Sequence, residues 1–313
     1  MRARRRLTAV LVAVLVAGLV AGLTAACGPS FEGLHLRIAT GAVGGVYNDL
    51  ARPLADAWAK DLGIARPEVL ATQGSRDNLN RVRSGGADVA FVAADLAAEA
   101  AAQYPGRLTA LARIHDDYLH IVVRADSPYT SVSMLKGRHI AVGSPESGVE
   151  YIANRVLAVA GLTDSVSVQQ LGLEDSLKAL ENHRLDALFW SGGLPTPLIT
   201  QYTQKVGLRL LDMASLQEGM QAYSPVYSTA TIPGSTYNQA GPVTTLVVPN
   251  FLVVPAKMAD DVAEALTRGL YDARPALAEA NRAALSIDVH PGIETEPLPL
   301  HPGALAYYRS LKV

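Results

Sequence analysis

Hydrophobic and polar positions alternate in short blocks along the first part of the chain. Residues 34–40 alternate apolar and polar side chains, which predicts a strand, whereas Leu50, Leu54 and Trp58 recur at helical spacing. The near-continuous apolar run at 87–93 is typical of a buried parallel strand. The expected elements are strands at 34–40, 87–93, 109–114 and 119–124, and helices at 48–62 and 94–102. This order predicts an α/β fold.

The same order returns in the middle of the chain. Arg184-Leu185-Asp186-Ala187-Leu188-Phe189 repeats, 98 residues later, the pattern of Gly86-Ala87-Asp88-Val89-Ala90-Phe91. Glycine-containing turns also recur, at 41–47 and 143–148. This period is too long for a solenoid and suits two similar lobes. The elements expected here are strands at 139–143, 166–171 and 185–190, and helices at 150–160 and 175–182.

Beyond residue 200 the pattern predicts strands at 227–232 and 244–254, then one helix at 260–278. His301, in a His-Pro-Gly sequence, is expected to cap or pack a last short helix. The fold class is therefore α/β with two lobes, each a mixed sheet flanked by helices. The chain is expected to cross near 124–126 and to return near 240–248. The lobes are assigned as 34–124 for lobe one, 125–242 for lobe two, and 243–313 for the return to lobe one.

The first 33 residues have a different character. Four arginines precede residues 7–26, which contain no charged side chain, and Cys27 follows. This arrangement predicts a signal peptide over 1–26. The segment before Cys27 resembles a bacterial lipobox, so Cys27 is the expected lipidation site and 27–33 a lipidated linker. An uncleaved membrane anchor is the alternative, since the apolar run is long enough to span a bilayer.

Composition and charge narrow the possible partners. The chain has 27 basic and 29 acidic residues, and without residues 1–26 the balance is 23 to 29. An acidic body argues against nucleic acid as a partner. A single cysteine excludes an intrachain disulfide, and the seven histidines lack metal-site spacing, so no metal is expected.

The glycine turn that follows the first strand is the first candidate site. Gly44, Gly45, Val46 and Tyr47 stand between a strand and a helix, where backbone N–H groups can meet an anion. Ligands of open α/β sheets bind at such strand ends. No dinucleotide fingerprint or phosphate-loop lysine is present, so no cofactor is expected. A purely structural turn is the alternative.

Two further segments share this position between a strand and a helix. Ser75 and Asn78 offer a hydroxyl and an amide at a helix start, although an ordinary helix cap explains them as well. Ser144, Ser147 and Gly148 form the equivalent turn of lobe two. The three segments together predict a ligand site between the lobes.

The sequence does not favour an enzyme. No serine stands in a nucleophile elbow, and only His115 and His120 fall near expected cleft loops. A solute-binding protein without chemistry is therefore favoured over a secreted hydrolase. For a carboxylate ligand, Arg76 and Arg113 are the candidate partners, and the sequence does not distinguish them.

Motifs along the whole mature chain, in the same order, resemble the TAXI family, the extracytoplasmic solute receptors of TRAP transporters. The motifs are Gly44-Gly45-Val46-Tyr47, Gly74-Ser75-Arg76-Asp77-Asn78-Leu79, Gly85-Gly86-Ala87-Asp88-Val89-Ala90, residues 135–143, Leu185-Asp186-Ala187-Leu188-Phe189 with Gly193-Leu194-Pro195, and Pro299-Leu300-His301-Pro302-Gly303-Ala304 with Tyr307 and Tyr308.

The resemblance implies a class II periplasmic-binding-protein fold that closes on a small organic acid or amino acid, with glutamate favoured. It implies ligand contacts from Gly44 to Tyr47, from Ser75 and Asn78, from Ser144 to Gly148, and from Trp190. It also implies a location outside the cytoplasm, lipid-anchored to the membrane, and delivery to a separate TRAP-type permease. A receptor of an ATP-driven importer and an adaptor for a sensor kinase are the alternatives.

Overall fold

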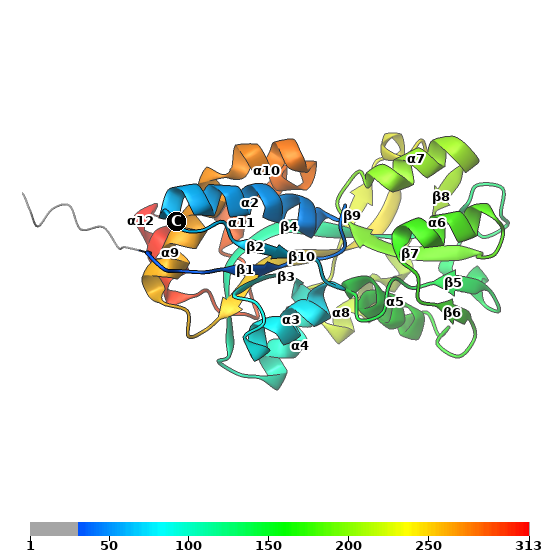
Figure 1. Cartoon of the computed structure of the whole chain (residues 1–313). Coiled ribbons are helices and arrows are strands. Elements are labelled where there is room, and N and C mark those ends of the chain that lie inside the picture. Colours follow the sequence, from blue (N-terminus) through cyan, green and yellow to red (C-terminus); the bar gives the residue numbers. More distant parts are fainter. Residues whose placement is uncertain (1–30, 313) are drawn as a thin grey trace, which may run out of the picture.

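The computed structural model describes residues 31–312, and the expected signal peptide and Cys27 lie outside the described residues. Figure 1 shows two groups of strands and helices joined by long strands in the middle. A single sheet of ten strands runs through both groups in the order β2-β1-β3-β10-β4-β7-β5-β6, with β8 on β4 and β9 on β10. The fold is α/β with a central sheet and flanking helices, as expected.

Lobe one contains the first strands and the last helices of the chain. Strands β1, β2 and β3 are short and parallel, and each is followed by a helix. Their carboxyl ends face the middle of the molecule (Figure 1). The elements are β1 (Arg37–Ala39), α2 (Val46–Leu62), β2 (Glu68–Leu70), α3 (Ser75–Ser84), β3 (Val89–Ala93), α4 (Ala94–Gln103), α9 (Asp260–Asp272), α10 (Arg274–Ala280), α11 (Val289–Gly292) and α12 (Pro302–Ser310).

Lobe two repeats the arrangement with strands β5, β6 and β7, which are parallel. Its elements are β5 (His139–Ala141), α5 (Gly148–Val159), β6 (Ser167–Gln169), α6 (Leu173–Glu181), β7 (Ala187–Gly192), α7 (Pro197–Val206), β8 (Leu208–Leu210), α8 (Gln217–Tyr223) and β9 (Ser228–Ile232). The strands expected at 139–143 and 166–171 are confirmed with shorter bounds, and the strand expected at 185–190 is confirmed two residues further along the chain.

Two long antiparallel strands connect the lobes, β4 (Leu108–Arg124) and β10 (Val243–Pro255). The expectation of two separate strands at 109–114 and 119–124 is wrong, because the polar residues between them continue the extended backbone. Up to Tyr118, β4 pairs with β10, and from Tyr118 onward it pairs with β7 of lobe two. Likewise β10 pairs with β9 up to Val247 and with β3 from Asn250.

The strand pairing therefore places the crossings inside β4 and β10. Residues 119–124 and 243–247 pair with lobe-two strands, which differs from the expected boundaries at 124/125 and 242/243. Each of these strands pairs with both lobes, so no loop in the sequence marks where the chain passes from one lobe to the other. The helix expected at 260–278 is also divided, since α9 ends at Asp272 and α10 begins with Pro275 in its first turn, where proline is tolerated.

Apolar side chains cover both faces of the sheet. One cluster packs α2, α9 and α12 on lobe one and includes Trp58, which is fully buried, while another packs α6 and α7 on lobe two. A third cluster is shared, because it contains residues of α3 and α4 as well as of α5 and α8. Among residues 31–312, no helix combines the length and apolar character needed to cross a bilayer.

Candidate functional site

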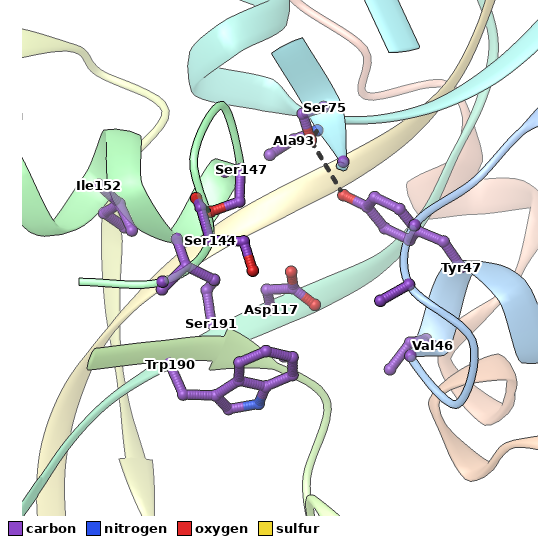
Figure 2. Close-up of a pocket in the computed structure, with 18 of the residues that line it drawn as sticks. Val46, Tyr47, Ser75, Ala93, Asp117, Ser144, Ser147, Ile152, Trp190 and Ser191 are labelled. Carbon is purple, nitrogen blue, oxygen red and sulfur yellow. Dashed lines mark hydrogen bonds between the residues drawn. The ribbon is translucent and has the colours of Figure 1, made fainter. Parts of the chain in front are cut away.

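A cavity of about 130 Å³ lies where the two lobes meet. That is roughly ten times the space that one water molecule needs, so a small organic solute fits. Figure 2 shows its walls, with Tyr47 and Ser75 on one side, Ser144, Ser147 and Trp190 on the other, and Asp117 between them. The lining residues are Gly41, Ala42, Gly45, Val46, Tyr47, Gln73, Gly74, Ser75, Ala93, Asp95, Asp117, Gly143, Ser144, Ser147, Gly148, Val149, Ile152, Gly172, Leu173, Trp190, Ser191, Gly192 and Val248.

The starts of five helices converge on this cavity. Its lining includes the N-cap residues of α2, α3, α4, α5 and α6, which are Gly45, Gly74, Ala93, Ser147 and Gly172. Four of these N-caps are glycine or alanine and offer no side-chain acceptor to the first N–H groups of their helices. Unpaired N–H groups and the positive end of a helix dipole favour an anion.

The wall formed by lobe one is held by hydrogen bonds between buried side chains. The Tyr47 hydroxyl donates to Asn250 Oδ1 and lies 3.4 Å from Ser75 Oγ. Ser75 Oγ in turn accepts from the backbone N–H of Ala93 at 3.0 Å. The Tyr47 ring stacks on Phe91, and burial raises the pKa of the Tyr47 hydroxyl, so it remains a neutral donor and acceptor.

The wall formed by lobe two contains small residues and one large ring. Ser147 caps α5, because its Oγ accepts from Glu150 N at 3.1 Å and donates to Ser144 O at 2.7 Å. Trp190 Nε1 donates to Thr196 Oγ1 at 3.1 Å, which leaves the indole ring as the surface that meets the cavity (Figure 2). This wall therefore presents neutral groups only.

The two walls approach each other closely at their glycines. Gly74 has φ +112°, a conformation that few other residues adopt, and a Cβ built on it would lie 3.7 Å from Gly148 N. Gly148 itself faces Ser75, whose Oγ would lie 3.5 Å from an added Cβ. The start of α3 thus touches the start of α5 across the cavity.

Two carboxylates line the cavity, and neither is among the site residues predicted from the sequence. Asp95, in the first turn of α4, accepts from Leu96 N at 2.7 Å and from the hydroxyl of Tyr227, a lobe-two residue, at 2.8 Å. Burial raises the pKa of Asp95 to about 6. Asp117 lies on β4 just before the crossing and is 8% exposed. The sequence signal that could have found Asp95 is a carboxylate in the first helical turn after the buried strand at 87–93.

Eight of the ten predicted site residues line the cavity, and whether they bind a ligand stays a prediction. They are Gly45, Val46, Tyr47, Ser75, Ser144, Ser147, Gly148 and Trp190. Gly44 and Asn78 are not in the lining. Gly44 is exposed in the turn before α2.

Asn78 is fully buried behind the wall of lobe one. Its Nδ2 donates to the carbonyl oxygens of Thr40 and Phe91, and its Oδ1 accepts from Thr72 Oγ1 at 2.6 Å. The amide therefore ties the ends of β1 and β3 together. The ligand contact predicted for Asn78 becomes a bracing role, because the side chain points from α3 into lobe one rather than into the cavity.

The arginines and histidines singled out in the sequence also lie outside the lining. Arg76 pairs with Glu99 at 3.4 Å, and Arg113 pairs with Asp116 and Glu294. His120 donates to Tyr118 O and faces the Tyr237 hydroxyl, and burial lowers its pKa to about 4. His301 is confirmed as the N-cap of α12. Within residues 31–312 no cluster of side chains suitable for a metal ion is found.

The fold and the cavity define a two-lobed α/β protein of the periplasmic-binding-protein type. Residues 38–310 match the model of the NMT1-like family, and the chain belongs to this family.

Solved structures share the fold at low sequence identity. The protein XAC2383 of Xanthomonas citri bound to ATP is 18% identical, with a TM-score of 0.53 over 88% of this chain and 95% of that one. The periplasmic aliphatic sulphonate binding protein SsuA of Escherichia coli is 18% identical, with a TM-score of 0.50 over 90% and 79%. An ancestral arginine-binding protein bound to arginine is 16% identical, with a TM-score of 0.51 over 80% and 98%.

Proposed function

We propose that this chain is an extracytoplasmic solute receptor that captures a small organic acid or amino acid, with glutamate favoured, between its lobes. The observation that carries the proposal is the cavity of about 130 Å³ on which five helix starts from both lobes converge. Backbone N–H groups at helix starts suit a carboxylate. A site built from both lobes couples binding to closure, as in hinge proteins.

The relatives of known structure support a receptor role. SsuA is named for binding aliphatic sulphonates, and the ancestral protein holds arginine. Aliphatic sulphonates and arginine are both small solutes. The role needs binding and release but no chemical step, so we assign no catalytic residue to the site.

We further propose a TRAP-type permease as the partner, since the ordered motifs described above resemble the TAXI receptors. Uptake of the identified solute into proteoliposomes that contain the partner permease tests this. An imposed ion gradient should drive uptake in the presence of the receptor. Uptake that requires ATP instead assigns the chain to an ATP-driven importer, and absence of uptake with either energy source favours a sensor adaptor.

Thermal unfolding of the purified protein with a solute panel tests the receptor function. A ligand that binds only the folded state at 100 times its Kd adds about 2.7 kcal/mol of stability. We expect L-glutamate or a related acid to raise the Tm and to give a saturable heat in calorimetric titration. A panel of amino acids, carboxylates, sulphonates, phosphates and sugars with no effect on the Tm would contradict the proposal.

Lipid anchoring is proposed from the leader alone. Cys27 is the only cysteine of the chain and stands directly after the apolar run. Cys27→Ser should abolish labelling with a radioactive fatty acid and release the protein from membranes. Undiminished labelling of the variant would show that Cys27 is not the acylated residue.

A further inference from the structure

The carboxylate of Asp117 is the least satisfied charged group of the cavity. Its Oδ1 is buried and has no hydrogen-bond partner among the residues that the structure describes. Figure 2 shows the carboxylate pointing into the space between Tyr47, Ser144 and Trp190. Oδ1 is enclosed beside His115 Nε2, 3.3 Å away, so the oxygen that can meet a solute is Oδ2, which also accepts no hydrogen bond from the described residues. A carboxylate left without a donor in an enclosed site is unfavourable, so Oδ2 is available to a donor that enters the cavity.

The other carboxylate of the cavity does not share this property. Both oxygens of Asp95 already accept hydrogen bonds, from Leu96 N and from the Tyr227 hydroxyl. The neighbouring Asp116 is compensated as well, because both of its oxygens accept from Arg113 at 2.9–3.0 Å outside the cavity. Asp117 therefore differs from Asp95 and Asp116 because no described residue donates a hydrogen bond to its carboxylate.

The described lining contains no positive side chain that could neutralise Asp117. No lysine, arginine or histidine is found among the cavity residues within 31–312. His115, which is 2% exposed, lies behind the wall with Nε2 3.3 Å from Asp117 Oδ1, in a geometry that makes no hydrogen bond. The cationic partner is therefore expected to arrive with the solute.

We propose that Asp117 is a specificity determinant that binds the ammonium group of the solute, while the helix starts hold its carboxylate. The inference rests on the receptor function proposed above and restricts its ligand to amino acids. The ring of Trp190, which borders the same space in Figure 2, adds a face that attracts cations. Acids without an amine would leave Asp117 buried and unpaired, and so are rejected.

The test compares each amino acid with the deamino acid of the same carbon skeleton, for example L-glutamate with glutarate. Each primary amino acid and its deamino counterpart is titrated calorimetrically into the wild-type protein and into Asp117→Asn. We expect an amino acid to bind to the wild type and its deamino acid to bind at least about 30-fold more weakly. Asp117→Asn should weaken the amino acid by a similar factor and leave the deamino acid unchanged or tighter.

Two controls keep the outcome interpretable. Asp116→Asn removes a carboxylate of the same strand that is paired outside the cavity, and should change affinity less than about twofold. Asp117→Asn should also raise the Tm of the unliganded protein, because it removes an unpaired buried charge. A lowered Tm would show that Asp117 already has a partner, His115 being the nearest, and would overturn the inference.

The remaining outcomes are decisive too. Equal affinity for an amino acid and its deamino acid overturns the inference, and so does binding of a solute without an amine when no amino acid binds. In both cases the receptor function stands. A protein that binds no solute of any class contradicts the receptor function itself.

Discussion

The two walls of the cavity are built on the same plan but with different chemistry. In lobe one, a turn, helix starts and buried polar side chains form a hydrogen-bonded network around Tyr47 and Ser75, and the two carboxylates, Asp95 and Asp117, belong to this side. In lobe two, the equivalent turn offers Ser144, Ser147 and Gly148 with the ring of Trp190, and no charged side chain within the described lining.

This difference suggests an order of events. A wall with fixed charges and preformed hydrogen bonds binds a charged solute without reorganisation, whereas a wall of neutral dipoles gains most once water has been excluded. We therefore expect the solute to bind lobe one first and lobe two to close over it.

The glycine turns should differ most in their tolerance of a side chain. Gly143, at the lobe-two turn, has φ +93°, and a Cβ there would lie 2.6 Å from Val149 Cβ. Strain and overpacking together make Gly143→Ala destabilising by about 4 kcal/mol. Gly44→Ala is the matched control, since Gly44 has φ +82° but an added Cβ meets nothing within 4 Å. It should cost about 1 kcal/mol. Urea unfolding measures both, and equal losses would contradict the contrast.

Asn78→Ala should destabilise lobe one without removing a side chain that lines the cavity. The change removes three hydrogen bonds from a fully buried amide and takes a side-chain donor from the Phe91 carbonyl, while the Thr40 carbonyl keeps Thr72 Oγ1 as a donor at 3.0 Å. We expect a loss of about 3 kcal/mol in unfolding free energy. Solute affinity at a temperature where the variant is folded should change little. A large loss of affinity with normal stability would return Asn78 to the ligand site.

Buried titratable groups give the lobes opposite pH dependence. The pKa of Asp95 is raised to about 6 by burial, so its contribution to stability falls as pH rises from about 4 to 6. The pKa of His120, on the lobe-two side of β4, is lowered to about 4, so its contribution rises from about 4 to 6.5. The two effects oppose each other in the wild type.

Removing either titratable group should reveal the pH dependence of stability that the other contributes. In Asp95→Asn, stability should rise between pH 4.5 and 6.5 more steeply than in the wild type, by up to about 3 kcal/mol in total. The stability of the His120→Asn variant should fall over the same pH range. Denaturant unfolding at several pH values measures this. Parallel pH profiles for the wild type and Asp95→Asn would show that Asp95 titrates normally.

The two serines of the lobe-two turn are expected to have different roles, Ser147 in capping α5 and Ser144 in binding the solute. Ser147→Ala removes the N-cap of α5 and should cost about 1 kcal/mol of stability. Ser144→Ala should cost less than about 0.5 kcal/mol, yet it should weaken solute binding, since Ser144 lines the cavity. Equal Tm values for the two variants would contradict the capping role of Ser147.

The lobes also touch outside the cavity lining, where a small effect on stability is expected. Glu99 of α4 accepts from the Tyr151 hydroxyl of α5 at 2.5 Å and lies 3.6 Å from Arg155. Because the Glu99 side chain is 40% exposed, Glu99→Gln should cost less than about 1 kcal/mol. It should increase the radius of gyration of the unliganded protein in X-ray scattering. Glu174→Gln, within α6, is the control and should leave the shape unchanged.

Local sequence determined the elements and much of the cavity. Alternating and continuous apolar runs set the strands, and segments between a strand and a helix were correctly expected to gather at one place, because carboxyl ends of parallel strands share an edge. Tyr47, Ser75 and Ser144 were found in this way, whereas Trp190 was expected only from the family resemblance. Asn78 was assigned to the cavity because a polar residue in a first helical turn has the same local signature whether it faces a ligand or braces two strands.

Only the tertiary structure decided what depends on pairing across the chain. That residues 109–124 form one strand, that the crossings lie at Tyr118 and between Val247 and Asn250, and that Asp117 reaches the cavity all follow from the registers of β4 with β10 and β7. Asp95 owes its raised pKa to burial, and Tyr227, which bonds to it, comes from 132 residues further along the chain. Burial and long-range partners are properties of the folded chain, and no local pattern of residues encodes them.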